Sequence, residues 1–243
     1  MNILRNIFAR IWALWGITSF IATFLIIFIP SQISWLMPPK VGQDYFIAVS
    51  RIWMRIWLTL VGCPVKIKGK DAFKKGQTYI ITCNHNSLMD VPISSPFIPA
   101  GNKTIAKSSF AKVPLFGFFY RKGSVLVDRN NDNSRKQSFD KMKAVLRQGI
   151  HMCIYPEGTR NRSNEPLKKF HDGAFRLAID TKTPVIPAVI FNTKKTLPAN
   201  KAFYFMPHRL SMHFLPAISP DGETTETLKE KVFTTMSKYY EGN

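Results

Sequence analysis

Short runs rich in apolar and β-branched residues alternate with helical segments from residue 64 to the end of this chain. The strand-like runs are residues 65–68, 79–83, 104–107, 124–128, 152–155 and 185–191. Helical periodicity is clearest at residues 134–148, which Gly149 ends, and at residues 223–241. This alternation predicts an α/β fold with a central, mostly parallel sheet flanked by helices. Ligands of such sheets bind at the carboxyl ends of the strands, so functional motifs are expected there.

The N-terminal part of the chain has the composition of a membrane segment. Residues 11–29 contain no charged side chain, follow Arg5 and Arg10, and are closed by Pro30. This run approaches the length of about 20 residues that crosses a bilayer core. It is longer than the roughly 7 to 15 apolar residues of a secretory signal, and no small-residue cleavage site follows it. We therefore expect it to lie in lipid.

A second amphipathic segment, residues 44–62, places Arg51 and Arg55 on one polar stripe and apolar side chains on the rest of its surface. That pattern is typical of a helix at a membrane interface with its arginines toward the headgroups. We predict that residues 1–62 form a two-helix membrane anchor dipped into one leaflet, and that residues 63–243 form one folded domain. A single spanning helix is the alternative.

The charge balance favours anionic partners. The chain has 34 Lys and Arg against 15 Asp and Glu, a formal net charge of +19, which suits nucleic acid, an acidic membrane leaflet or a phosphorylated substrate. The three cysteines, Cys63, Cys83 and Cys153, are widely separated and lack metal-ligand spacing. Neither a disulfide framework nor a zinc site is indicated, and we expect Cys83 and Cys153 to be buried in strands.

Two polar motifs follow two of the predicted strands. His85 and Asp90 lie five positions apart after residues 79–83, and Glu157-Gly158-Thr159-Arg160 follows residues 152–155. A turn would let Asp90 accept a hydrogen bond from one imidazole nitrogen and leave the other free to take a proton. Asp90 could instead, or also, cap a helix that starts before Pro92, and an isolated His85 would be structural by default. Two polar motifs that follow strands of one sheet suggest a single site.

In order and spacing these motifs resemble the glycerolipid acyltransferases, whose signatures are HxxxxD and a later FPEGTRS-like segment. Residues 107–117 and 123–129 are similar to the second block of that family, and residues 185–189 to its fourth. The resemblance covers roughly residues 64 to 217. It implies a catalytic domain that moves a fatty acyl group from a thioester to the sn-2 hydroxyl of lysophosphatidic acid, giving phosphatidic acid without an acyl-enzyme.

The resemblance also implies roles for individual residues. His85 would be the general base, oriented by Asp90. Arg160 would bind the acceptor phosphate, with Thr159 as a hydroxyl donor, Gly158 allowing close backbone approach, and Glu157 positioning Arg160 or the substrate. Lys107 is either a second phosphate contact or a solvated lysine. Arg129, which ends the second block, is a weaker candidate. The segment continues Asn161-Arg162-Ser163, whereas the family often has serine directly after the arginine.

The expected partners are the bilayer, lysophosphatidic acid, and acyl-CoA or acyl carrier protein as donor, with no cofactor, metal or nucleic acid. Similarity to bacterial members implies the inner membrane, with the catalytic domain facing the cytoplasm. Another lysolipid acceptor and an acyl thioesterase are alternatives. A serine hydrolase is disfavoured because the chain has no G-x-S-x-G sequence. A basic module that only binds lipid or nucleic acid would leave the His85–Asp90 spacing unexplained.

Overall fold

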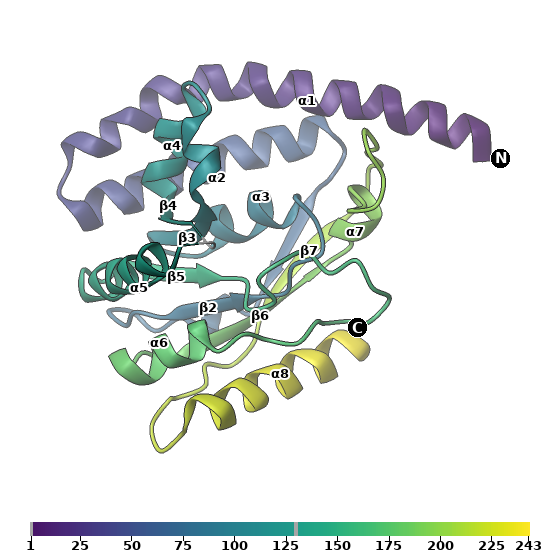
Figure 1. Ribbon diagram of the computed structural model, residues 1–243. Coiled ribbons are helices and arrows are strands. Elements are labelled where there is room, and N and C mark those ends of the chain that lie inside the picture. Colours follow the sequence, from purple (N-terminus) through teal and green to yellow (C-terminus); the bar gives the residue numbers. More distant parts are fainter. Residues whose placement is uncertain (1, 129–130) are drawn as a thin grey trace.

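The computed structural model, which describes residues 2–128 and 131–243, contains a central seven-stranded sheet with helices on both faces (Figure 1). The strands are β1 Val65–Lys68, β2 Ile80–Cys83, β3 Asn102–Lys107, β4 Ser124–Val127, β5 His151–Ile154, β6 Val185–Phe191 and β7 Leu210–Phe214. The α-helices are α1 Asn2–Gln32, α2 Pro39–Leu60, α3 Asp90–Ser94, α4 Phe116–Gly123, α5 Asp132–Arg147, α6 Gly173–Thr181, α7 Thr193–Thr196 and α8 Thr225–Glu241. Four 3-10 segments complete the fold: η1 Ile33–Leu36, η2 Lys70–Ala72, η3 Ser95–Phe97 and η4 Ser108–Lys112.

The strand order is β1-β7-β6-β2-β5-β3-β4, and every pair is parallel except β6 with β7. The predicted α/β fold with a mostly parallel sheet is therefore confirmed. Strand β7 was not predicted from the sequence, although Leu210, Met212 and Phe214 alternate with polar residues in a period-two pattern that is typical of a strand. Pairing with β6 and β1 on either side makes it a strand.

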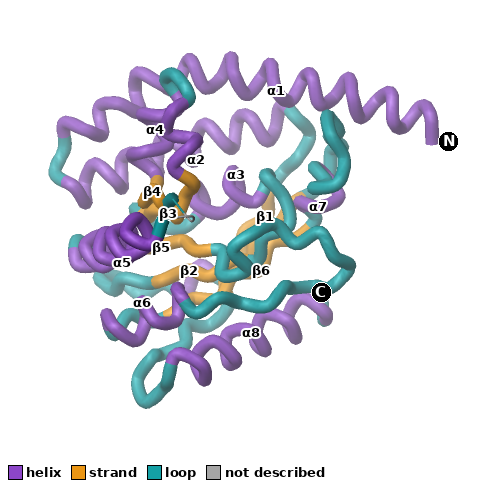
Figure 2. Tube along the Cα trace, in the orientation of Figure 1, coloured by secondary structure: helices purple, strands orange, loops and turns teal. Residues whose placement is uncertain are grey.

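The two faces of the sheet belong to two separate cores. Ile81 on β2 packs with residues of α1, α2 and the region around α3. Its neighbour Ile80 points the other way and packs with α5, α6 and α8, because successive side chains of a strand alternate between faces. Figure 2 shows these two helical layers above and below the strands. Cys63, Cys83 and Cys153 are buried and free, as expected of small core residues.

The first two helices form a hairpin that packs on the domain. Helix α1 is longer than the uncharged run, and it is the one helix among the described residues that is long and apolar enough to cross a membrane. It lies along α2, where the Trp57 indole donates to the carbonyl of Gly16 at 3.1 Å. Trp53 and Trp57 are buried in the same core as Ile81, so the hairpin shares a core with the sheet.

The orientation of one arginine differs from the sequence prediction. Arg51 points into the domain rather than toward headgroups, and its guanidinium donates to the carbonyls of Pro96 and Ile98 at 2.7 and 2.6 Å. The short segment η3 leaves these carbonyls without helical partners, and a guanidinium fork suits two such acceptors. Arg55, one turn later, is exposed.

Candidate active site

The two motifs meet because their strands are neighbours. Strands β2 and β5 run parallel, with Thr82 opposite Ile154, so the loops after them leave the same edge of the sheet. The backbone amide of His85 donates to Glu157 Oε1 at 2.8 Å, and the amide of Asn161 donates to the carbonyl of His85 at 2.6 Å. Both peptide groups around His85 are thereby attached to the 157–161 segment.

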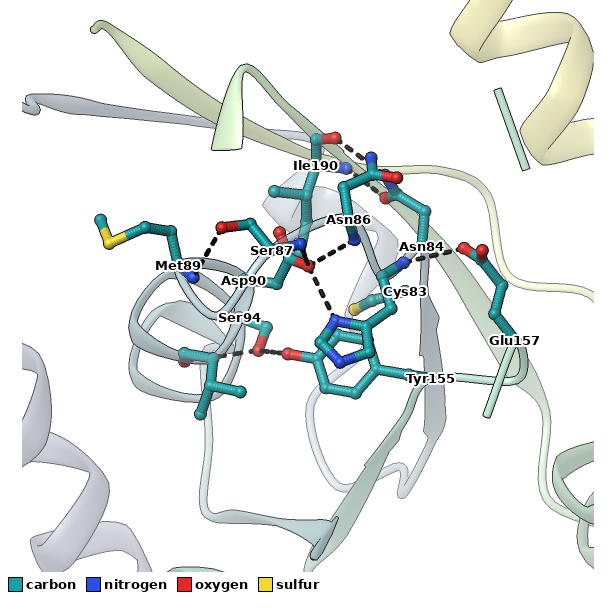
Figure 3. Close-up of polar contacts among 12 residues, drawn as sticks. Cys83, Asn84, Asn86, Ser87, Met89, Asp90, Ser94, Tyr155, Glu157 and Ile190 are labelled. Carbon is teal, nitrogen blue, oxygen red and sulfur yellow. Dashed lines mark hydrogen bonds and ion pairs between the residues drawn. The ribbon is translucent and has the colours of Figure 1, made fainter. Parts of the chain in front are cut away.

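His85 and Asp90 form a hydrogen-bonded pair, and Figure 3 shows Asp90 with its neighbours Asn86 and Ser87. His85 Nδ1 lies 2.8 Å from Asp90 Oδ2, which also accepts the backbone amides of Asn86 and Ser87 at 2.6 and 2.7 Å. A carboxylate partner keeps the proton on Nδ1, so Nε2 of the neutral ring is the acceptor. The His85 side chain is 17% exposed, and its Nε2 bonds no residue that the structure describes. The pair has the geometry of a general base and its orienting acid.

Asp90 does not cap helix α3. It is the first residue of that helix, which has no side-chain cap, and its carboxylate turns back over the preceding loop. Three donors converge on Oδ2, while Oδ1 is buried without a partner among the described residues. The alternative reading of Asp90 as an N-cap is therefore wrong, because the loop before the helix supplies the donors.

The ring of Tyr155 packs against one face of the His85 imidazole. The Tyr155 ring stacks on the His85 ring with a centroid separation of 4.4 Å and an interplanar angle of 25°. Its hydroxyl lies 2.6 Å from Ser94 Oγ, one turn after Asp90 on α3. Burial raises the pKa of the Tyr155 phenol, so it stays protonated. Sequence reasoning missed this residue; its one signal is the position directly before the Glu157 motif.

Side chains also extend the sheet into the His85 loop. Asn84 donates to the carbonyl of Ile190 at 2.9 Å and accepts from the amide of the same residue at 2.7 Å. Ser87 Oγ donates to the carbonyl of Leu197 at 2.7 Å. These bonds tie the loop to β6 and to the segment after α7, which limits how far the histidine backbone can shift. Neither residue stood out in the sequence.

Glu157 contacts His85 rather than Arg160. Its side chain is 1% exposed, and its two oxygens accept the backbone amides of His85 and Lys168 at 2.8 and 3.1 Å. No bond joins it to Arg160 among the described residues. Burial raises the pKa of Glu157 to about 7, although both amide donors lower it. The predicted role in positioning Arg160 thus differs from these contacts, which hold the His85 backbone.

The remaining predicted residues lie around this edge. Gly158 has φ +69°, and a Cβ there would come within 2.8 Å of His171 Cδ2. Thr159 is exposed and accepts Lys168 Nζ at 2.7 Å. Arg160 is partly exposed and Lys107 is exposed, and neither side chain bonds any described residue.

Lys107 ends β3, the strand beside β5, so β2, β5 and β3 bring Lys107 and the two motifs to one edge. Two unpaired cations at the same sheet edge as an imidazole can bind an anionic substrate. Arg129 lies outside the described residues. Within the described part of the chain, no group of three His, Cys, Asp or Glu side chains could hold a metal ion.

Comparison with known proteins gives a consistent result. Residues 64–191 match the acyltransferase family. The 1-acyl-sn-glycerol-3-phosphate acyltransferase of Cocos nucifera is 33% identical over 141 residues, which cover 57% of this chain and 45% of the relative. The enzyme of the same name from Saccharomyces cerevisiae is 28% identical over 199 residues, covering 78% and 65%. The chain thus spans about half to two thirds of the length of these relatives.

A solved structure is similar over the whole chain. The crystal structure of the 1-acyl-sn-glycerophosphate acyltransferase PlsC from Thermotoga maritima matches with a TM-score of 0.81 and 23% identity, covering 100% of this chain and 97% of the other. At this identity the likeness shows a shared fold. The fold includes the N-terminal hairpin as well as the sheet, since the match extends over all of this chain.

Proposed function

Because the chain belongs to the acyltransferase family, we propose that it moves a fatty acyl group from an acyl thioester to the sn-2 hydroxyl of lysophosphatidic acid. The observation that carries the proposal is the His85–Asp90 pair, whose free Nε2 lies at the same edge of the sheet as two unpaired cations. The donor is acyl-CoA or acyl carrier protein, and the product is phosphatidic acid.

In the proposed reaction His85 Nε2 takes the proton of the sn-2 hydroxyl while the hydroxyl oxygen forms a bond to the thioester carbonyl carbon. The carbon–sulfur bond then breaks, and the leaving thiolate takes the proton from the imidazolium, so the neutral ring is restored. Asp90 stabilises the imidazolium between these steps. No enzyme nucleophile takes part.

The acceptor phosphate binds at Arg160 and Lys107 in this proposal. A guanidinium can hold two phosphate oxygens at once, and an ammonium adds a point charge. Thr159 offers a hydroxyl, and Gly158 leaves the backbone open to the ligand. Glu157 acts as a positioning residue, because its oxygens accept the amides of His85 and Lys168.

The proposal includes a membrane. Helix α1 exposes large apolar side chains along its length, including Leu4, Ile11 and Leu25 at 77%, 61% and 53%. Leu88, within the loop between His85 and Asp90, is 53% exposed. We propose that the hairpin of residues 1–62 dips into one leaflet while residues 63–243 catalyse, at the cytoplasmic face of the inner membrane. Such a position lets a lysolipid reach His85 without leaving the bilayer.

The test uses purified protein, one acyl thioester and a panel of lysolipids, with the product identified by mass. We expect phosphatidic acid, and thiol release that depends on the acceptor. Thiol release that is independent of any acceptor would identify a thioesterase instead. His85→Ala should abolish transfer with the fold and vesicle binding unchanged, and substantial turnover by that variant would remove His85 from the mechanism.

The acceptor site is tested by Arg160→Met, with Arg162→Met as the matched control, since Arg162 is an exposed arginine in the same loop. Loss of a charged hydrogen bond should raise KM for lysophosphatidic acid about tenfold or more with the thioester KM unchanged. Equal effects of the two substitutions would show only a general loss of positive charge.

A further inference from the structure

A cationic pocket lies away from the active-site edge, between the start of α1 and the loop that joins α7 to β7. It has a volume of about 280 Å3 and is lined by Arg5, Asn6, Lys201 and Tyr204. The loop is attached to the helix, because the amide of Phe205 donates to the carbonyl of Ala9 at 3.1 Å. In Figure 1 this loop rises from α7 to α1 near the N-terminus.

The side chains that line this pocket form no ion pair or hydrogen bond with the residues that the structure describes. Neither Arg5 nor Lys201 forms an ion pair with a described carboxylate, and Lys201 Nζ instead lies 4.5 Å from the centroid of the Tyr204 ring. Tyr204 is only 6% exposed, yet its hydroxyl bonds none of the described residues. This hydroxyl is not fully buried and lines the pocket, so it can donate to a ligand there. A guanidinium, an ammonium, an amide and a hydroxyl around one cavity are the donors that bind a phosphate.

The surroundings of the pocket are apolar. The neighbouring residues of α1 expose large side chains, with Ile3 at 75%, Leu4 at 77% and Ile7 at 51%. In the facing loop Phe203 is 48% exposed and has φ +48°, a backbone conformation that is unfavourable for an aromatic residue. Cations surrounded by exposed apolar and aromatic side chains match the boundary between lipid headgroups and acyl chains.

We propose that this pocket binds the phosphate of an anionic bilayer phospholipid, as a lipid site separate from the one that binds the acceptor. The inference rests on the proposed membrane association. The loop that supplies Lys201 and Tyr204 begins at Leu197, whose carbonyl accepts a hydrogen bond from Ser87 in the His85 loop. A lipid in the pocket therefore holds both α1 and the segment that supports the active-site loop against the same bilayer surface.

The test measures flotation of the full-length protein with phosphatidylcholine vesicles, with and without phosphatidylglycerol. The readout is the ratio of the two partition coefficients. Two surface cations account for about a 30-fold preference for an anionic bilayer, so Arg5→Gln with Lys201→Gln should lower the ratio by about that factor. Tyr204→Phe removes only the hydroxyl and should lower the ratio about fivefold.

Lys66→Gln with Lys68→Gln is the matched control. These lysines also line a pocket of about 280 Å3 together with His213. Tyr239 of α8 lies 3.0 Å from His213 Nδ1, which places that pocket on the sheet face opposite α1. The control should leave the ratio nearly unchanged. Equal losses in both double variants, or no loss in either, would overturn the proposal.

Two further measurements separate the remaining outcomes. Thermal stabilisation by inorganic phosphate that disappears in the Arg5 and Lys201 variant would identify a free anion as the occupant, and would overturn the lipid assignment. Acyl transfer in detergent micelles should be the same in all variants as in the unaltered protein. If the unaltered protein itself shows no transfer there, the proposed function fails while the vesicle result still decides the lipid site.

Discussion

Replacing Glu157 by Gln keeps the shape of the side chain but removes its charge and one of its two acceptor oxygens. The two oxygens of Glu157 accept the amides of His85 at 2.8 Å and Lys168 at 3.1 Å. A glutamine has one acceptor oxygen, so its NH2 group must face one of these N–H donors. The side chain is 1% exposed, and water cannot take over the lost bond.

The magnitude follows from those contacts. A buried N–H without an acceptor costs about 1–3 kcal/mol of stability, and a bond to a charged acceptor exceeds a neutral one by about 1 kcal/mol. We therefore expect kcat above neutral pH to fall about tenfold, with KM for the acceptor unchanged, because the His85 backbone loses its charged anchor. At lower pH the difference in kcat should narrow, since Glu157, with a pKa of about 7, is itself neutral there.

Stability gives a second readout with a defined sign. Burial raises the pKa of Glu157 from 4.5 to about 7, so the folded state holds this proton more tightly than the unfolded state. The stability that the neutral acid contributes is complete below pH 4.5 and is lost as the pH rises through 7. Integrated over this shift, the loss is about 3 kcal/mol. Glutamine does not ionise, so the variant has no such pH dependence. Its free energy of unfolding, relative to that of the unaltered protein, should therefore rise by about 3 kcal/mol as the pH rises from 4.5 through 7.

The assay combines thiol release at several pH values with urea unfolding of the same samples. Glu165→Gln is the control, because Glu165 is an exposed carboxylate of the same loop and should change neither readout. Unchanged kcat in Glu157→Gln, together with a stability difference that does not vary with pH, would refute the assignment of Glu157 to the His85 amide.

The remaining predictions concern three other residues. Tyr155→Phe keeps the stacking on His85 but loses the hydrogen bond to Ser94, so kcat should fall about fivefold. Tyr155→Leu also loses the stacking and should lower kcat more. Steady-state kinetics checks both variants, and KM should be unchanged. Gly158→Ala combines φ +69° with a contact of 2.8 Å to His171 and should cost about 1–3 kcal/mol in urea unfolding. His151, whose Nδ1 accepts the amide of Tyr79, has its pKa lowered from 6.5 to about 4 by burial. The stability that its neutral ring contributes, about 3 kcal/mol, is present above pH 6.5 and is lost as the pH falls through 4. His151→Gln should remove this pH dependence, which unfolding curves recorded across that range would show.

The architecture was largely predictable because each strand carries its own pattern. The run Val185–Phe191 is almost entirely buried and could form only a central strand, and the uncharged run before Pro30 could form only an apolar helix. Strand β7 and the short helices α4 and α6 were missed. These elements have only 5, 8 and 9 residues, so each shows too few repeats of its period to be identified without the sheet against which it packs.

The site was predictable in composition and only partly in geometry. Parallel strands leave a sheet at one edge, so His85 and Glu157 were expected close together from their positions after two strands. Three features could not be predicted: the hydrogen bond from the His85 amide to Glu157, the stacking of Tyr155 on the imidazole, and the orientation of Arg51 into the domain. Each depends on which backbone atoms another segment leaves without partners.

The local patterns and the order of motifs along the chain were enough to predict the fold class, the family and the two residues that we propose as base and orienting acid. Local periodicity and strand-end positions are properties of short segments, and such properties can be read without neighbours. The tertiary structure decided the rest, because a bond such as that from the His85 amide to Glu157 joins residues 72 positions apart. Packing across the sheet, rather than any local pattern, selects which of many possible distant partners meet.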